Sequence, residues 1–232
     1  MIIDFHSHVL PEVDHGSKSS DEAKKQLELI SAGGVDIVVA TSHFYPHVHR
    51  VSDFLQDAER AAAKLSTFSE HLGSTKICLG AEVLLCEGIN KMPDFEKLRI
   101  RGTNCMLIEM PSTGSWDHLI DTVDDIIEGG YILILAHIDR YLKHYEEQID
   151  LLLRKGAIAQ INADSLTSFF SRKRVMEYID CGVVSAIGSD LHGADKKAYQ
   201  PFISAKKNIG ADNYEKIMSR SAKLLQTAEF IN

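Results

Sequence analysis

Short apolar runs alternate with amphipathic segments along most of the chain. Seven of these runs are rich in Val, Ile, Leu and Ala and contain few polar residues, which is typical of strands covered on both faces. We therefore predict β-strands over residues 2–5, 35–41, 76–80, 105–109, 131–136, 157–161 and 183–188.

The segments between these runs carry helix signals. Ser19 and Glu22 have the spacing of a capping box, and Ala23, Leu27 and Ile30 form an apolar stripe that ends before two glycines. Helices are predicted over residues 20–33, 53–71, 117–128, 146–155, 172–181 and 213–230, with short helical pieces and loop over residues 84–101.

A strand followed by a loop and a helix, repeated along the chain, is typical of a (β/α) barrel, but open doubly wound sheets share this order. The distribution of His, Asp and Glu separates the two architectures. In an open sheet only the strands beside the switch point contribute to a site, whereas here at least six of the seven strand ends carry such a residue. We predict an α/β fold, a distorted (β/α)7 TIM-like barrel, as a single domain over residues 1–232.

The imidazoles and carboxylates at these strand ends predict a cluster of divalent metal ions. Parallel strands end at the same rim of a barrel, so the side chains at their ends converge. Nitrogen and carboxylate ligands without thiolate suit Mn, Fe or Zn, and the set is too large for one ion. The candidate metal ligands are His6, His8, His15, His43, Glu82, Glu109, His137, Asp190 and His192.

The strongest local motif is Asp4-Phe5-His6-Ser7-His8 at the end of the first strand. Alternation along a strand puts both imidazoles on one side, where they can chelate one ion, and Asp4 on that side could orient an imidazole through its Nδ1–H. Asp190 and His192 repeat this spacing after the last strand, where a barrel would close. For an isolated motif, a pair of satisfied polar residues is the alternative.

Two further segments offer candidates with open alternatives. In Asp14-His15-Gly16, either polar side chain can be a ligand, and a polar turn is the alternative. His47 and His49 lie in an aromatic-rich loop that could gate the site or touch substrate, but a surface loop is favoured and both stay outside the predicted ligand set.

The candidate catalytic residues are Arg140 and His43, the latter also a metal ligand. Arg140 follows His137 by three residues, and its planar fork of donors suits a phosphoryl group. An exposed arginine in a surface ion pair is the alternative.

Composition narrows the partners and the compartment. A formal net charge of −8 argues against nucleic acid and anionic membranes, although bound cations still permit phosphate esters as substrates. The four cysteines are scattered and typical of reduced thiols, and none lies in a Gly-rich phosphate loop. The sequence predicts neither a secretory signal nor a membrane-spanning helix, so we expect a cytoplasmic protein.

In their order and spacing, these motifs resemble the PHP (polymerase and histidinol phosphatase) superfamily, from residue 3 to about residue 195. The chain is most similar to the bacterial PHP-type protein-tyrosine phosphatases of capsular and exopolysaccharide biosynthesis. This resemblance implies a PHP-type barrel with a trinuclear site, usually supplied with Mn. It also implies a phosphotyrosine substrate on the tyrosine kinase that controls polysaccharide chain length, and it leaves the oligomeric state open.

Two departures from the family pattern concern the site. The family usually has two aspartates before the glycine and uses the second as a ligand, whereas this chain has His15 there. Either His15 binds metal with an altered preference, or Asp14 reaches in instead. Lys196 and Lys197 stand near the usual Arg-Pro pair, while Arg140 matches the family arginine.

We therefore expect a phosphatase in which a metal-activated hydroxide attacks phosphorus while the metals and Arg140 neutralise the equatorial oxygens. Tyrosine, with a pKa of about 10, leaves with little help, so a general acid is optional. One alternative is a PHP phosphatase of a small phosphate monoester such as histidinol phosphate. An amidohydrolase-like metallohydrolase is another, although Glu109 stands where that class typically has lysine. A third alternative is a barrel without enzymatic activity, in which other residues would replace some of the metal ligands.

Overall fold

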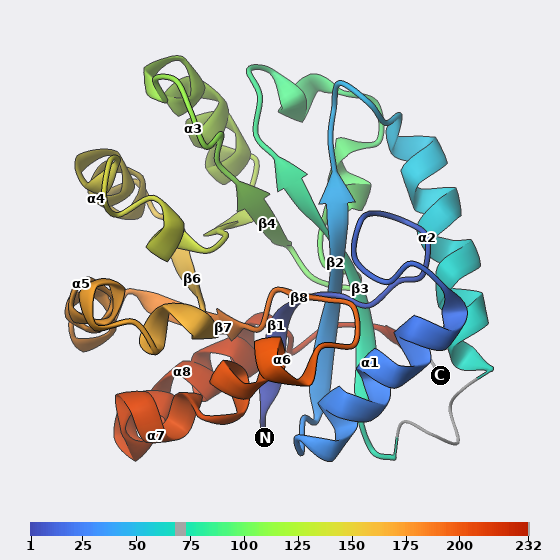
Figure 1. Ribbon diagram of the computed structural model, residues 1–232. Coiled ribbons are helices and arrows are strands. Elements are labelled where there is room, and N and C mark those ends of the chain that lie inside the picture. Colours follow the sequence, from blue (N-terminus) through green and yellow to red (C-terminus); the bar gives the residue numbers. More distant parts are fainter. Residues whose placement is uncertain (68–72, 232) are drawn as a thin grey trace.

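A curled sheet lies at the centre of the computed structural model, which describes residues 1–67 and 73–231 (Figure 1). The first seven strands pair in parallel in chain order, and β8 pairs with the free side of β1. Residues 189–190 alone separate β7 from β8, so this pairing joins the two ends of the sheet and confirms the predicted barrel architecture. The strands are β1 (Ile3–His8), β2 (Ile37–Phe44), β3 (Lys76–Leu84), β4 (Cys105–Glu109), β5 (Ile132–Leu135), β6 (Ile158–Asn162), β7 (Val184–Gly188), β8 (Leu191–His192) and β9 (Phe230–Ile231).

Helices cover the outside of this sheet, with α1 and α2 on one side and α3, α4 and α5 on the other (Figure 1). Ser19 caps α1 by accepting the N–H of Glu22, as predicted, while the Glu22 carboxylate accepts the N–H of Lys18. The α-helices are α1 (Ser20–Ala32), α2 (Val51–Ser66), α3 (Ile120–Glu128), α4 (Glu146–Arg154), α5 (Phe169–Asp180), α6 (Lys196–Ile203), α7 (Ala205–Ile209) and α8 (Ala211–Leu224). Short 3-10 helices are η2 (Ile89–Lys91), η3 (Phe95–Leu98), η4 (Asp117–Leu119), η5 (Ile138–Arg140) and η6 (Ala163–Leu166).

Three strands are longer than predicted, and the additional residues carry the site. β1, β2 and β3 continue past residues 5, 41 and 80, so His6, His8, His43 and Glu82 lie within strands rather than after them. In the sequence, these polar residues interrupt apolar runs and therefore indicate the end of a strand. In the fold they continue the period-two alternation into the barrel, where β1 and β2 are buried at every residue.

The C-terminal part differs most from the prediction. The helix predicted over residues 213–230 is wrong at its end, because α8 stops at Leu224 and β9 pairs antiparallel with β3. The sequence pattern also predicts neither α6, which contains Pro201, nor α7, which Gly210 follows. The helix predicted over 53–71 corresponds to α2, and residues 68–71 of the predicted helix lie outside the described residues.

Two glycines allow the backbone to approach the histidines of β1. A Cβ atom on Gly188 would lie 2.4 Å from Cβ of His6, and one on Gly16 would lie 2.5 Å from Cβ of His8. Neither glycine has a positive φ, so each provides space rather than conformational freedom. A side chain at either position would push β7 or the first loop away from β1.

No helix among the described residues combines the length and the apolar character needed to cross a membrane.

Candidate metal centre

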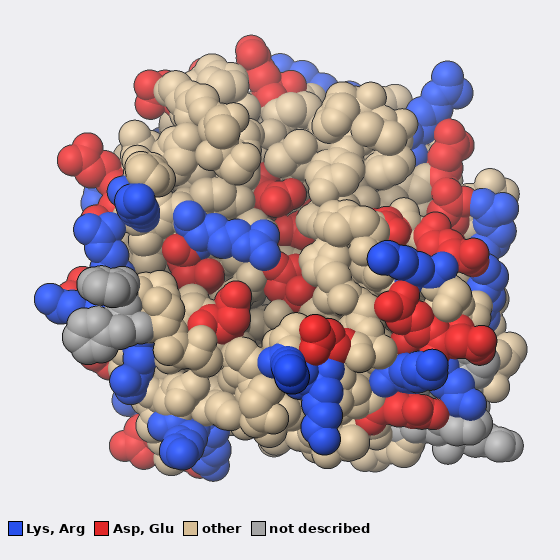
Figure 2. Space-filling model, viewed as in Figure 1, with Lys and Arg blue, Asp and Glu red and all other residues tan. Residues whose placement is uncertain are grey.

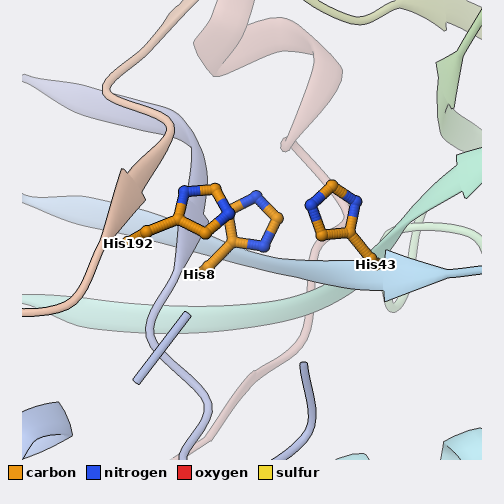
Figure 3. A group of neighbouring side chains, drawn as sticks. All are labelled: His8, His43 and His192. Carbon is orange, nitrogen blue, oxygen red and sulfur yellow. The ribbon is translucent and has the colours of Figure 1, made fainter. Parts of the chain in front are cut away.

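The predicted metal ligands converge at one rim of the barrel, where the carboxyl ends of the strands meet. Among the described residues, three groups have donor atoms that all lie within 4.8 Å of one another. One group is made of three imidazoles, from β1, β2 and β8 (Figure 3). The groups are His8, His43 and His192; His6, His8, Glu82 and Asp190; and His43, Glu82 and Glu109.

These groups share members, so they form one cluster. His8, His43 and Glu82 each belong to two of them. His137 belongs to none, but its Nε2 lies 2.7 Å from Oε1 of Glu82 and 3.7 Å from Oε1 of Glu109. Shared ligands are how two or more cations are held a few Å apart.

Glu82 lies at the centre of the cluster and is fully buried. Its Oε2 is 2.9 Å from Nδ1 of His43, 3.1 Å from Nε2 of His6 and 3.4 Å from Nε2 of His8. Its Oε1 faces His137. A carboxylate with both oxygens among four imidazoles has the geometry of a bridging ligand.

Hydrogen bonds behind two rings determine which nitrogen faces the cluster. Nδ1 of His8 donates to Oδ2 of Asp14 over 2.8 Å, and that oxygen also accepts the backbone N–H of His43. Nδ1 of His192 donates to the carbonyl oxygen of Asp190 over 2.9 Å. Because both partners are acceptors, each ring carries a proton on Nδ1, which leaves the lone pair of Nε2 available to a metal ion.

The pKa shifts of three predicted ligands also suit a bound cation. Burial raises the pKa of Glu109, and the negative charge of Glu82 raises it further. Burial lowers the pKa of His192 to about 4, assisted by the charge of His8, and burial lowers the pKa of His137. A divalent cation relieves both effects, because it stabilises the carboxylates and accepts neutral imidazoles as ligands.

Half of the buried side-chain atoms without a hydrogen-bond partner belong to predicted ligands. Of eight such atoms in the described part of the chain, four are in the cluster. Buried polar atoms are normally hydrogen-bonded, so this concentration of atoms without a hydrogen bond in one group of residues fits the binding of an ion there. Imidazole nitrogens and carboxylate oxygens together fit divalent Mn, Fe or Zn. The four atoms are Nδ1 of His43, Oε2 of Glu82, Nδ1 of His137 and Nε2 of His192.

The first loop gives its two candidates different positions. Asp14 lies behind His8, and its oxygens accept hydrogen bonds from His8, His43 and Gly16. His15 is exposed at the mouth of the barrel, with its ring stacked at 4.6 Å on the rings of both His43 and His192. Of the two, His15 therefore faces the cluster, while Asp14 orients His8.

Replacing His15 tests this arrangement. We expect His15→Asp to retain bound metal but to raise the ratio of bound Mn to bound Zn, because a carboxylate suits Mn better than an imidazole does. Elemental analysis after equilibration with equal Mn and Zn measures the shift. His47→Asp is the control, because His47 is exposed on the neighbouring loop. Unchanged metal content, metal ratio and rate in His15→Asp would show that His15 is not a ligand.

Arg140 lies in η5 on the open side of the cluster. Its guanidinium donates to Oδ2 of Asp190, and its side chain is half exposed. The ring of Tyr45 stacks on that of His43 at 5.1 Å. Figure 2 shows Asp and Glu side chains in a hollow near the middle of this face, with Lys and Arg side chains beside it. Charged and aromatic groups that could contact a substrate thus lie at the mouth.

Other polar groups near the mouth stay outside the cluster. His47 is exposed, and Nδ1 of His49 accepts the N–H of Tyr45. Lys196 begins α6 and lines a hollow of about 640 Å³ together with His192. Lys196 and His192 therefore border the same hollow.

Asp4 does not orient an imidazole, so that expectation is wrong. Its Oδ1 accepts the backbone N–H of Ser189 over 2.8 Å and so fixes the turn between β7 and β8.

Two predicted ligands have an unusual backbone conformation. Asp190, in the turn between β7 and β8, has a φ of 52°, and His137 has a φ of 31°. Non-glycine residues are uncommon in that region, and their strain is typical of functional sites.

Sequence patterns do not identify two amides that touch the cluster. Gln160 and Asn162 lie on β6, whose end carries none of the predicted ligands. Oε1 of Gln160 is 3.2 Å from Nδ1 of His6, and Nδ2 of Asn162 donates to Oδ2 of Asp190 over 2.8 Å. The available signal is their alternation around Ile161, which places both amides on one side of an otherwise apolar strand.

Known proteins resemble this chain over nearly its whole length. A putative tyrosine-protein phosphatase CapC of Staphylococcus aureus is 29% identical, covering all of this chain and 93% of that protein. The tyrosine-protein phosphatase CpsB of Streptococcus pneumoniae is 27% identical, covering 92% and 91%. YwqE of Bacillus subtilis, named a tyrosine-protein phosphatase, is 25% identical, covering 85% and 80%.

Solved structures share the fold. One comes from a study of YwqE from Bacillus subtilis and CpsB from Streptococcus pneumoniae, described as unique metal-dependent tyrosine phosphatases. It superposes with a TM-score of 0.81 at 20% identity, covering 98% of this chain and 96% of that one. An inactive dihydroorotase-like domain of Chaetomium thermophilum gives a TM-score of 0.56 at 6% identity, covering 98% and 79%. The model of the family described as "Capsular polysaccharide synthesis, CpsB/CapC" matches residues 2–226, so the chain belongs to this family, as its motifs predict.

Proposed function

We propose that this protein is a metal-dependent protein-tyrosine phosphatase of capsular or exopolysaccharide biosynthesis. The observation that carries the proposal is the buried Glu82 among four imidazoles, with Glu109, Asp190 and the half-exposed Arg140 beside it. Relatives that are named tyrosine-protein phosphatases support the substrate class. The metal dependence stated for the YwqE and CpsB structures supports the role of the cluster.

In this proposal the whole chain, residues 1–232, is one domain built around the metal centre. Three ions fit a cluster of this size, with Mn favoured and Fe or Zn as alternatives. The proposed ligands are His6, His8, His15, His43, Glu82, Glu109, His137, Asp190 and His192.

The residues of the chain bind and orient the phosphate ester. Divalent ions in the cluster would acidify water toward the nucleophile and offset negative charge on phosphorus-bound oxygens. Arg140 is positioned to exchange its bond with Asp190 for two parallel bonds to the phosphoryl group. Tyr45, on the ring of His43, offers a flat surface at the mouth for the phenyl ring of the substrate. The leaving tyrosine has a phenol pKa of about 10 and departs with little help, so a general acid is optional.

The proposed partner is a phosphotyrosine protein, namely the tyrosine kinase that controls polysaccharide chain length, and the proposed location is the cytoplasm. The family description supports the link to capsule synthesis. The acidic net charge of −8 gives no reason to expect nucleic acid or anionic membrane as a partner.

A substrate panel tests the proposed activity. Phosphate release is measured from a phosphotyrosyl peptide, a phosphoseryl peptide and histidinol phosphate, each with added Mn and with EDTA. We expect Mn-dependent release from the phosphotyrosyl peptide alone, because only an aryl ester combines a good leaving group with a ring that fits against Tyr45. Preference for histidinol phosphate would keep the metal centre but contradict the proposed substrate. No release from any of them would contradict the phosphatase itself.

A further inference from the structure

The side-chain amide of Gln160 lies between two predicted ligands from opposite sides of the barrel. Its Oε1 is 2.6 Å from the backbone N of His137 and 3.2 Å from Nδ1 of His6. Its Nε2 is 2.6 Å from the carbonyl oxygen of Ile161 and 3.0 Å from Oδ1 of Asn162. The amide is fully buried and uses both its acceptor and its donor ends.

The orientation of this amide follows from its backbone partners. The N–H of His137 can only donate, and the carbonyl of Ile161 can only accept, so the oxygen must face His137 and the nitrogen must face Ile161. His6 therefore meets an acceptor. Its Nδ1 must carry a proton, which leaves Nε2 as the ligand atom toward Glu82.

The same amide also holds a backbone N–H and a second side-chain amide in place. By holding the N–H of His137, it fixes a residue whose backbone has φ of 31°. Through Oδ1 of Asn162 it orients a second amide, whose Nδ2 donates to Asp190. Three predicted ligands, one within β1 and two just after β5 and β7, thus depend on one side chain of β6.

We propose that Gln160 is a positioning residue for metal binding, which sets the tautomer of His6 and the backbone of His137. This inference rests on the proposed metal centre. Gln160 does not contact the metal itself, and it acts through the ring and the backbone that it holds.

Gln160→Met and Gln160→Glu separate positioning from simple packing. Methionine has a similar volume and removes the acceptor, whereas glutamate keeps an acceptor toward His6 and His137 and loses the donor. Thr122→Val is the control. Thr122 is buried on α3 and accepts the N–H of Gly88, so the substitution removes a partly buried hydrogen bond without touching the cluster.

Zinc affinity is measured by competition with a chelator, and histidine N–H signals are recorded by ¹H–¹⁵N NMR of the zinc-loaded protein. We expect Gln160→Met to lower zinc affinity about 10- to 100-fold, the cost typical of losing a partner behind a metal ligand. One protected imidazole N–H signal of the wild type should disappear. Gln160→Glu should keep that signal and most of the affinity, and Thr122→Val should match the wild type in both.

Wild-type affinity and signals in Gln160→Met would overturn the inference. So would equal losses of affinity in Gln160→Met and Gln160→Glu, since they would show that metal binding does not depend on the acceptor toward His6 and His137. If Gln160→Met does not fold, Gln160→Glu still decides, because loss of the His6 signal there would contradict the assigned tautomer. A wild-type protein that binds no zinc would instead contradict the proposed metal centre, and the inference with it.

Discussion

Glu82→Gln is expected to abolish metal binding and nearly all turnover. The amide keeps the shape of the side chain but replaces a charged bridging oxygen with an N–H₂ donor facing the imidazoles of the cluster. Loss of a partner behind a ligand typically costs 10–100-fold in affinity or activity, so loss of the central ligand should cost more than roughly 100-fold. Bound metal per chain and phosphate release from a phosphotyrosyl peptide measure the effect.

Glu87→Gln is the matched control for this substitution. Glu87 is an exposed glutamate a short distance beyond the end of β3, and the same chemical change there should leave metal content and turnover unchanged. Full metal content and full turnover in Glu82→Gln would show that the cluster is not the reactive centre.

Arg140→Lys should lower turnover strongly while the metal stays bound. Lysine keeps the positive charge but cannot present two parallel donors, so the phosphoryl group loses one contact in the transition state. Loss of one such donor typically costs 10²–10³-fold in kcat, and we expect a decrease of about 100-fold or more. Steady-state kinetics with a phosphotyrosyl peptide measure the loss of turnover, and elemental analysis measures whether the metal stays bound.

Arg154→Lys, at an exposed position on α4, is the control for this change. An Arg140→Lys protein with wild-type kcat would place Arg140 in a surface ion pair only, which is the alternative that its sequence context leaves open. A parallel loss of metal would instead assign Arg140 to holding Asp190.

The fold was predictable because apolar runs and helix caps recur in a regular order. The ends of elements were less predictable. A histidine or glutamate that points into a barrel looks like a strand end in sequence, which explains why the predictions for β1, β2 and β3 stop short. The pairing of β9 with β3 joins the chain end to a strand far away in sequence, and no local pattern encodes such a contact.

The candidate ligands were predictable for a related reason. Burying charged or imidazole groups at strand ends is costly unless they bind something, so His6, Glu82 and Asp190 stand out against apolar surroundings. Their supports were not predictable. From the sequence, Asp14 could be either a metal ligand or a residue that supports one. Only its hydrogen bond with His8 shows that its carboxylate faces that ring. Gln160 is neutral and sits within a strand, so only its contacts reveal its connection to the site.

In the proposed function, phosphotyrosine hydrolysis depends on metal held by the cluster. The most direct test strips the wild-type protein of metal with a chelator, refills it with Mn in steps, and follows phosphate release from a phosphotyrosyl peptide against ions bound per chain. We expect no phosphate release from the stripped protein and recovery of release as the ions return. We also expect alkylation of the cysteine thiols to have no effect on release. Full turnover by protein that holds no metal would contradict the proposed metal dependence of the phosphatase.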